Sequence, residues 1–495
     1  MAGRWLLVAA AGLATIVATT PAPSAWSLER EGFSQASAPR HAAPAPAASS
    51  LEAATARRFA AIRRDPLRLR AFVAAMPKGG DLHNHLSGSI YAEDYLAWAA
   101  ADSLCVATAT MTIVGGTCDE RTGPLPAASI VRNPTLFNQA VDALSMRHWS
   151  RSINGHDHFF AAFTKMGPVA GKFGEMLAAV TAQAAAEHVS YLELMLTPDD
   201  GASGVVAATV PADTDFGRWR DRLLAAGLRD TVVKAAVQRL DAAEARRNEI
   251  QGCGTPAPQP GCAVTVRYIS QVYRATGAPL VFAQMLSGFV LAAADPRIVS
   301  FNLVQPEDYP AAIRDFSQQM AMLDFLQRQY PDVPVTLHAG ELADGLVPPA
   351  ALRFHIRQSI ALGHARRIGH GASVMSEDDP FGLLREMAAR KVLVEIALTS
   401  NDQILDIRGD RHPLRLYLKY GVPVAIVTDD MGVARSTHTQ EFVKAIEEHG
   451  LDYLTLKRMV RNSLEYAFVD SATRRALQTA LERDFIAFER RHTQS

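Results

Sequence analysis

The fold of this chain is decided by the segment Val422-Pro423-Val424-Ala425-Ile426-Val427, which is followed directly by Thr428-Asp429-Asp430. All six residues of this segment are apolar, without alternation, a pattern typical of a parallel strand buried on both faces. Two adjacent acidic residues at the end of such a strand are costly to bury unless a metal ion or hydrogen-bond donors satisfy them. The segment therefore predicts a parallel sheet with a functional site at the carboxyl ends of its strands.

Seven further runs have strand character, and long amphipathic or alanine-rich segments separate most of them. The eight expected strands are Gly79–Leu86, Val189–Leu196, Val264–Tyr273, Ile298–Val304, Val333–His338, Arg367–His370, Val392–Leu398 and Val422–Thr428. The expected helices include Phe173–His188, Asp215–Arg247, Ala311–Tyr330 and Ala350–Leu362. Eight repeats of strand and helix predict an α/β fold of the (β/α)8 TIM-barrel type with extra helices. An open doubly wound sheet is the rival, but no Gly-x-Gly-x-x-Gly turn supports it.

A long insertion, residues 101–160, follows the first expected strand. It contains several aromatic residues, among them Phe159 and Phe160. As a loop above a strand end it would form a lid or a pocket wall, while ordinary core packing is the alternative. The insertion also contains His156 and His158, which we interpret as surface or lid residues.

The N-terminal region has the composition of a targeting segment. Arg4 precedes an apolar stretch from Trp5 to Ala18 that is too short to span a bilayer comfortably. Residues 1–27 therefore predict a secretory signal peptide, with an uncleaved membrane anchor as the alternative. Residues 28–56 predict a flexible linker rich in Ala, Pro and Ser, and residues 57–495 the barrel. The mature protein is expected to be exported, to the periplasm or beyond, and to carry no stable membrane span.

The cysteines agree with export. There are four, Cys105, Cys118, Cys253 and Cys262, and they permit three pairings. In an oxidising compartment the local pairs Cys105–Cys118 and Cys253–Cys262 are the simplest expectation.

The charge of the chain is balanced, with 50 Lys and Arg against 51 Asp and Glu, so the chain lacks the basic character of a nucleic-acid-binding protein.

Three more motifs end at or beside expected strands. They are Asp81-Leu82-His83-Asn84-His85, His338-Ala339-Gly340-Glu341 and Ile368-Gly369-His370-Gly371. His83 and His85 are two residues apart and project to the same side of a strand. With His338 and Asp429 they make a set of three nitrogen donors and one oxygen donor, which suits a divalent ion, and zinc is the expected one.

Two residues of these motifs remain available for acid–base chemistry. Glu341 is placed to protonate a substrate atom near the metal, and His370 to orient or deprotonate a water molecule there. Asp430 is free to accept hydrogen bonds from a substrate, although a helix N-cap is its alternative role. The fourth strand has no lysine that could bridge two ions. One zinc ion per chain is therefore expected.

The motif set resembles the adenosine deaminase family over about residues 70–470. The resemblance rests on Met76-Pro77-Lys78 before the first histidine pair, on His-Ala-Gly-Glu, Gly-His-Gly and Thr-Asp-Asp in that order, and on Asn462-Ser463-Leu464-Glu465-Tyr466. The expected signal peptide, the cysteine-bearing insertion and Tyr191-Leu192-Glu193-Leu194 look more like the secreted, growth-factor-type branch.

The resemblance implies a role for each motif residue. It makes His83, His85, His338 and Asp429 zinc ligands, Glu341 the proton donor to the purine ring and His370 the residue that positions water. Asp430 would bind the five-membered half of the purine, and Gly340, Ser87 and Gln305 complete the expected substrate contacts. Ser87 stands where the family often has an acidic residue that contacts ribose. Gln305 stands where it commonly has glycine, in Asn302-Leu303-Val304-Gln305.

The expected function is therefore zinc-dependent hydrolysis of adenosine and 2′-deoxyadenosine to inosine and deoxyinosine, with release of ammonia. Adenine or an N6-modified adenine nucleoside is the alternative substrate. A secreted nucleoside-binding protein without catalysis, and a barrel hydrolase acting on a non-purine amide or lactone, are alternatives of other classes. The expected partner is a small purine nucleoside, and the sequence does not indicate an oligomeric state.

Overall fold

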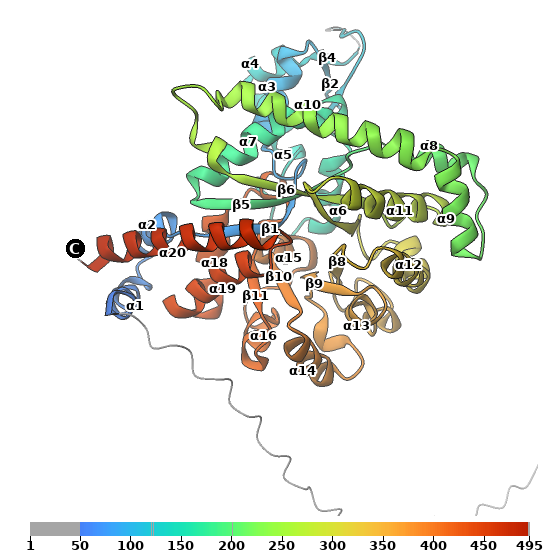
Figure 1. Ribbon diagram of the computed structural model, residues 1–495. Helices are drawn as coiled ribbons and strands as arrows, with labels where there is room; N and C mark the ends of the chain where they lie inside the picture. Colours follow the sequence, from blue (N-terminus) through green and yellow to red (C-terminus); the bar gives the residue numbers. More distant parts are fainter. Residues whose placement is uncertain (1–49, 120, 122, 200, 494–495) are drawn as a thin grey trace, which may run out of the picture. The chain divides into compact units, whose positions relative to one another are not determined.

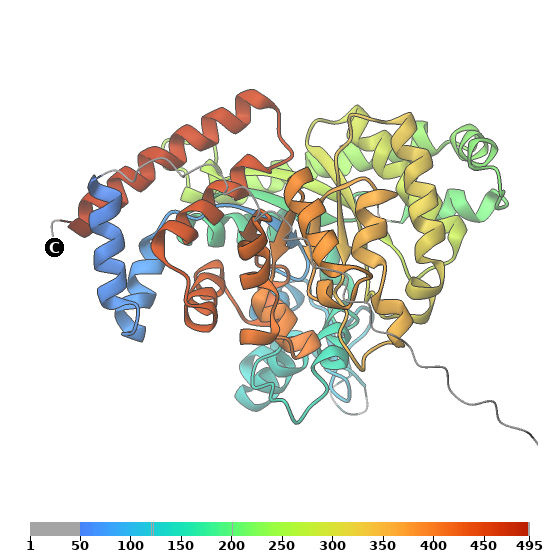
Figure 2. The same ribbon diagram turned by 90° about the horizontal axis from the view of Figure 1, so that it is seen from below.

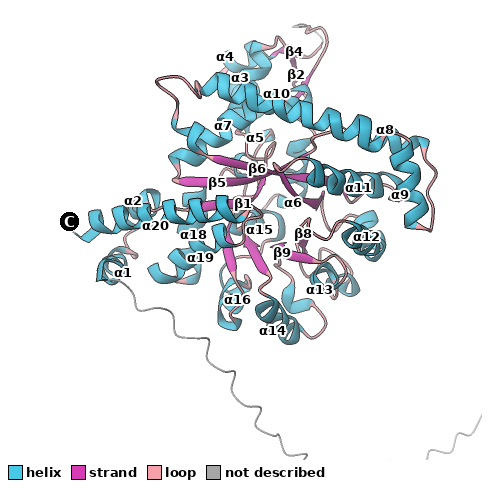
Figure 3. Ribbon diagram, in the orientation of Figure 1, coloured by secondary structure: helices cyan, strands magenta, loops and turns pink. Residues whose placement is uncertain are grey.

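The computed structural model describes residues 50–493 except 120, 122 and 200. Eight parallel strands form its centre, and helices surround them (Figure 3). The strands are β1 (Gly79–His85), β5 (Val189–Leu196), β6 (Thr265–Tyr273), β7 (Ile298–Val304), β8 (Val335–Ala339), β9 (Ala365–His370), β10 (Leu393–Ile396) and β11 (Val424–Ile426). Each lies within or largely overlaps one of the eight expected runs.

The strands pair as two four-stranded parallel sheets, in the orders β1-β5-β6-β7 and β11-β10-β9-β8. Backbone hydrogen bonds join β11 to β1, because the His85 amide donates to the Asp429 carbonyl (3.0 Å) and the Asp429 amide to that of His83 (2.9 Å). Side chains join β7 to β8, where the His338 amide donates to Asn302 Oδ1 (2.8 Å). The two sheets therefore close into the predicted (β/α)8 barrel, and site residues lie at both seams.

Buried apolar residues fill the barrel and the layer beneath its helices, as expected for strands covered on both faces. The principal outer helices are α7 (Phe173–Ala186), α9 (Phe216–Ala225), α10 (Lys234–Gln251), α11 (Ala278–Ala294), α12 (Pro310–Gln329), α13 (His355–Ala361), α14 (Pro380–Arg390), α16 (Leu414–Tyr420), α18 (His438–His449) and α19 (Tyr453–Glu465) (Figure 1).

Three sequence expectations need correction. The single helix expected over Asp215–Arg247 is divided, because Gly227 adopts a left-handed φ of 95° and a π-helical turn precedes α10. The strand expected to reach Leu398 ends at Ile396, and Leu398 begins helix α15 (Leu398–Leu405). The segment 350–362 contains a short 3-10 turn before α13.

The insertion adds a small antiparallel sheet and three helices to the barrel. Its strands β2 (Cys105–Ala107), β3 (Thr112–Val114) and β4 (Leu125–Pro126) make an antiparallel sheet in the order β3-β2-β4. Helices α4 (Ala127–Arg132), α5 (Pro134–Ala143) and α6 (Gly155–Phe163) follow. Disulfides join Cys105 to Cys118 and Cys253 to Cys262, which confirms the two local pairings.

The predicted signal peptide, residues 1–27, and the predicted linker up to residue 49 lie outside the described residues. Residues 50–56 are not linker, because helix α1 (Ser50–Ile62) begins at Ser50. This helix lies beside the C-terminal helix α20 (Ser471–Thr493) (Figure 2), and Lys457 bridges them through Glu52 and Glu489, each 2.6 Å away. Composition alone suggested a linker, but burial of Phe59 anchors the segment. Within the described range, no helix is both long and apolar enough to cross a bilayer.

Candidate metal and active site

Four predicted ligands meet at the carboxyl ends of β1, β8 and β11. His83 Nε2 lies 3.0 Å from His338 Nε2 and 3.3 Å from Asp429 Oδ1. His85 Nε2 lies 3.2 Å from His338 Nε2 and 3.4 Å from the same Asp429 oxygen. Ligands held at about 2.0–2.2 Å by one tetrahedral zinc ion lie about 3.3–3.6 Å from one another. The four separations, 3.0–3.4 Å, lie within or slightly below this range, so the side chains are placed to share a single ion.

Each of these side chains is also held from behind. Glu395 Oε2 accepts a hydrogen bond from His83 Nδ1 (2.7 Å), and Asn302 Oδ1 accepts one from His338 Nδ1 (2.9 Å). The Gln271 amide lies 3.0 Å from His85 Nδ1, and Ser400 Oγ donates to Asp429 Oδ2 (2.6 Å). Such outer partners fix the ring orientations and leave the Nε2 atoms of His83 and His338 as lone-pair donors. The donor set therefore fits a bound metal.

The sequence analysis did not identify Glu395 as a site residue, although a signal was present. The residue interrupts the apolar strand Val392-Leu393-Val394-Glu395-Ile396, and a carboxylate in a buried strand needs a partner. Its other oxygen accepts from Arg367 Nε (2.6 Å), and Arg367 also pairs with Glu193 Oε2 (2.5 Å). All three side chains are fully buried. A buried charge network therefore supports the metal site from inside the barrel.

Backbone strain is concentrated around the site. Asp429, His370 and Gln305 adopt left-handed φ values of 59°, 66° and 78°. Non-glycine residues rarely adopt this conformation, and it persists only where the surrounding structure imposes it. Gly369 explains part of the packing, because a Cβ there would lie 2.7 Å from the ring of His83. A side chain at position 369 would therefore displace this ligand ring.

Glu341 and His370 face each other beside the ligand cluster. Glu341 Oε1 lies 3.6 Å from His370 Nε2, and that nitrogen lies 3.9 Å from Asp429 Oδ2. Burial, reinforced by the charges of Asp429 and Glu307, raises the pKa of Glu341 well above its usual range. Burial lowers the pKa of His370 to about 4. The pair thus combines a carboxyl group that favours its proton with an imidazole that is neutral near pH 7.

A chain of hydrogen bonds assigns the tautomer of His370. The Leu414 amide donates to His412 Nδ1 (3.2 Å), so His412 carries its proton on Nε2 and donates it to Asn401 Oδ1 (3.1 Å). The Asn401 amide group then donates to His370 Nδ1 (3.0 Å). With Nδ1 occupied as an acceptor, neutral His370 carries its proton on Nε2, the buried atom that has no protein partner. It therefore presents a donor to the site.

Glu307 holds the loop that contains Gly340 and Glu341. The sequence analysis did not identify Glu307 as a site residue. Its carboxylate accepts the backbone N–H groups of Gly340 (3.1 Å) and Glu341 (2.7 Å). His355 Nδ1 lies 2.5 Å from it, and Arg274 Nη1 lies 3.8 Å away. Burial alone would raise the pKa of Glu307, but its contacts with His355 and Arg274 lower it, so it acts as an anion.

A cavity of about 380 Å³ opens onto this site, which is in the size range of small-molecule pockets. His85, His338, Glu341 and Asp430 form its polar end. Helix α6 supplies an aromatic wall of Phe159, Phe160 and Phe163. The insertion therefore contributes to the cavity, as one of its two predicted roles required. His156 and His158 do not line it; His156 Nε2 contacts Asp308 (3.0 Å) and His158 binds backbone carbonyls.

Three of the four predicted substrate contacts line the cavity, and Gly340 does not. Asp430 Oδ1 is buried and has no protein partner among the described residues, and its side chain does not cap α17 (Met431–Ala434). Ser87 and Gln305 line the cavity, but Gln305 Oε1 accepts the Ala275 amide (3.0 Å). Gly340 does not line it, and its N–H is committed to Glu307.

The fold and the site together define the class of protein: a (β/α)8-barrel hydrolase whose metal centre is built from histidine and aspartate side chains. The sequence profile of the family described as adenosine deaminase matches residues 134–483. The chain belongs to the adenosine deaminase family.

Individual relatives are more distant. An adenosine deaminase of Enterococcus faecalis is 29% identical over 191 residues, which cover 38% of this chain and 51% of that protein. The chain thus matches about half the length of this relative. Two solved structures share the fold. A zinc-bound amidohydrolase from Burkholderia ambifaria is 17% identical, with a TM-score of 0.51, and the match covers 86% of this chain and 95% of that one. The Arabidopsis N6-mAMP deaminase is 18% identical, with a TM-score of 0.54, and the match covers 83% of this chain and 99% of that one.

Proposed function

We propose that this protein is an exported, zinc-dependent deaminase that hydrolyses adenosine and 2′-deoxyadenosine to inosine and deoxyinosine. The observation that carries the proposal is the cluster of His83, His85, His338 and Asp429 near ligand spacing, with Glu341 beside it at the polar end of the cavity. Membership of the adenosine deaminase family supports the reaction class.

Zinc is the favoured metal because three imidazole nitrogens and one carboxylate oxygen, in a compact buried set, match its preferences. The zinc-bound amidohydrolase of the same fold supports this choice. When bound, the ion would lower the pKa of a water molecule toward neutrality. All other steps belong to the chain's own side chains.

In the proposed reaction a water oxygen bonds to the ring carbon that bears the amino group, and the bond to that nitrogen breaks to release ammonia. One proton of the water completes the ammonia, and the other restores the carboxyl group of Glu341. Glu341, whose raised pKa favours the protonated carboxyl, gives a proton to the adjacent ring nitrogen. His370 donates from Nε2 and orients the attacking water, rather than removing its proton in the resting state. Asp430 holds the five-membered ring of the purine.

The cavity favours a neutral substrate over a phosphorylated one. Among the described residues that line it there is no lysine or arginine, and phosphate recognition ordinarily requires such cations. A nucleoside therefore suits this chain better than the N6-methyl-AMP that the name of the Arabidopsis neighbour indicates. The aromatic wall of α6 supplies an apolar surface for the base.

Export is supported by the two disulfides, which persist in oxidising compartments. The expected N-terminal signal adds the second argument. Cell fractionation tests this part of the proposal: the mature protein should appear in the periplasm or medium with a shortened N-terminus. Retention of the full-length chain in the cytoplasm would reject it.

The activity is tested by the ultraviolet spectrum of adenosine incubated with purified mature protein, with chelator, and with zinc restored. We expect conversion to the inosine spectrum that chelator abolishes and zinc restores. The Glu341→Gln variant should bind zinc and nucleoside but not turn over. Equal inactivity of wild type and variant, with nucleoside bound, would indicate a binding protein. Conversion of adenine or an N6-modified nucleoside alone would reassign the substrate.

A further inference from the structure

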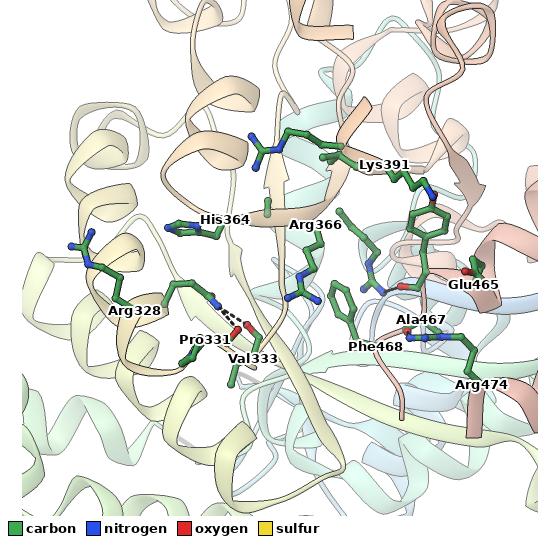
Figure 4. A pocket seen from close by; sticks show the side chains of 16 residues that line it. Arg328, Pro331, Val333, His364, Arg366, Lys391, Glu465, Ala467, Phe468 and Arg474 are labelled. Carbon is green, nitrogen blue, oxygen red and sulfur yellow. Dashed lines mark hydrogen bonds between the residues drawn. The ribbon is translucent and has the colours of Figure 1, made fainter. Parts of the chain in front are cut away.

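A second cavity lies at the opposite end of the barrel from the metal site. It has a volume of about 610 Å³ and is lined by residues at the amino ends of β8, β9 and β10 and by the segment after α19 (Figure 4). Parallel pairing sets this location, because Leu393 of β10 pairs with Arg367 of β9 and Val335 of β8 with Ala365. His338 and His370 stand at the other ends of the same strands. The proposed deaminase chemistry makes no use of this cavity.

The lining of this cavity is strongly basic although the chain as a whole is nearly neutral. Six arginine or lysine side chains line it, against the single carboxylate of Glu465. Three of the six already have carboxylate partners: Arg328 with Asp324, Arg390 with Glu386, and the buried Arg367.

The other three cations are Arg366, Lys391 and Arg474. Within the described part of the chain none of them has a carboxylate partner. Arg366 and Lys391 are exposed. Arg474 donates from Nη2 to the carbonyls of Ala467 and Val469, and its Nε is buried without a partner. In Figure 4 Arg366 lies between Arg328 on one side and Arg474 on the other.

The inner wall of the cavity is rigid. Arg367 is fully buried, pairs with Glu193 and Glu395, and donates to the Tyr466 carbonyl (3.0 Å). The Phe468 ring stacks on its guanidinium at 3.8 Å, and the Phe468 amide donates to Glu193 Oε1 (2.7 Å). A ligand would therefore meet a preformed wall, and the unpaired cations at the rim would supply its charge recognition.

We propose that this cavity is a binding site for a phosphate group, presented either as inorganic phosphate or as a phosphomonoester. Arg366, Lys391 and Arg474 supply the positive charge and N–H donors. Arginine suits this ligand because its planar fork donates two parallel hydrogen bonds to phosphate oxygens. The site is separate from the nucleoside cavity, whose lining has no such cation.

The test is calorimetric titration of the zinc-loaded full chain with inorganic phosphate and, in a second arm, with AMP, at constant ionic strength. The variant Arg366→Gln/Lys391→Gln removes two of the three unpaired cations. The matched control Arg229→Gln/Lys419→Gln makes the same charge change at exposed residues outside the cavity. Circular dichroism and Tm establish that both variants fold.

We expect saturable binding that weakens at least about tenfold in the cavity variant and stays within about twofold in the control. Tighter binding of AMP than of phosphate would identify a nucleotide as the source of the group, and equal binding would identify phosphate alone. Absence of saturable binding in both arms would overturn the proposal. So would equal weakening in both variants, which would indicate bulk electrostatics, or undiminished binding in the cavity variant, which would place the anion at the metal.

Discussion

Replacement of Glu395 by glutamine tests whether this buried carboxylate fixes the tautomer of His83 in the metal site. Glu395 is fully buried and accepts three hydrogen bonds, from His83 Nδ1 (2.7 Å), Thr336 Oγ1 (2.9 Å) and Arg367 Nε (2.6 Å). Burial alone would raise its pKa, but Arg367 and His83 lower it, so it is a carboxylate that only accepts. Glutamine keeps one accepting oxygen and introduces two N–H donors, so at least one existing donor must face an N–H group.

Two arrangements are then available. If the new amide N–H faces His83, the ring must accept at Nδ1 and carry its proton on Nε2, the atom 3.0 Å from His338 Nε2. That tautomer cannot donate a lone pair to a metal. If the N–H faces Arg367 instead, the buried guanidinium keeps Glu193 as its only carboxylate partner. Loss of such an outer partner typically lowers metal affinity about 10–100-fold, equivalent to about 1.4–2.7 kcal/mol.

The assay is competition for zinc between the protein and a chromophoric chelator, with kcat measured at saturating zinc. The control is Glu447→Gln, which makes the same change at an exposed glutamate of helix α18. We expect weaker zinc binding in Glu395→Gln only, with partial recovery of activity when zinc is in excess. Zinc affinity equal to that of wild type, in a folded Glu395→Gln protein, would refute the reasoning that this carboxylate fixes the His83 tautomer.

Three other predictions concern the acid, the purine contact and the insertion. Glu341→Gln should lower kcat about 10²–10⁴-fold with zinc still bound, and a loss below tenfold would contradict its role as proton donor. In Gly88→Ala the new Cβ would stand 1.5 Å from Asp430 Oδ1, so kcat/KM should fall about 100-fold while zinc binding persists; unchanged kinetics would remove Asp430 from the purine site. Burial alone would lower the pKa of His156, but Asp308 and Asp157 raise it to about 9, above the unfolded value near 6.5. The stabilisation is therefore complete below pH 6.5 and lost as pH rises through 9, so the Tm difference between wild type and Asp308→Asn should shrink over that window; a constant difference would refute it.

The sequence by itself determined the strands and the motifs at their ends. A buried parallel strand is a local pattern, since a short apolar run such as Val422–Val427 carries its own signal. Once eight such runs alternate with helices, the barrel follows, and with it the meeting of His83, His338 and Asp429 at one face. Local cysteine spacing also led to both disulfides.

Other features depended on residues far apart in the chain. Glu395, Arg367 and Glu193 come from three strands, and only strand register inside the closed barrel brings them together behind His83. The sequence marks Glu193 and Glu395 as charges in apolar runs, but it does not say which partner each one meets. The tautomer of His370 likewise depends on a relay through Asn401 of helix α15 and His412 of the loop before α16.

Backbone conformation and wall placement also required the tertiary structure. The left-handed φ values of His370, Asp429 and Gln305 run against local preference and are imposed by surrounding contacts. The helix α6 of the insertion became a wall of the cavity because it packs against α15 and α17, which the sequence could not distinguish from ordinary core packing. Short-range patterns thus determined which elements form and which residues carry chemistry. Long-range packing decided the contact partners of those residues, their protonation and which of them line the cavity, because these properties depend on neighbours that are distant in sequence.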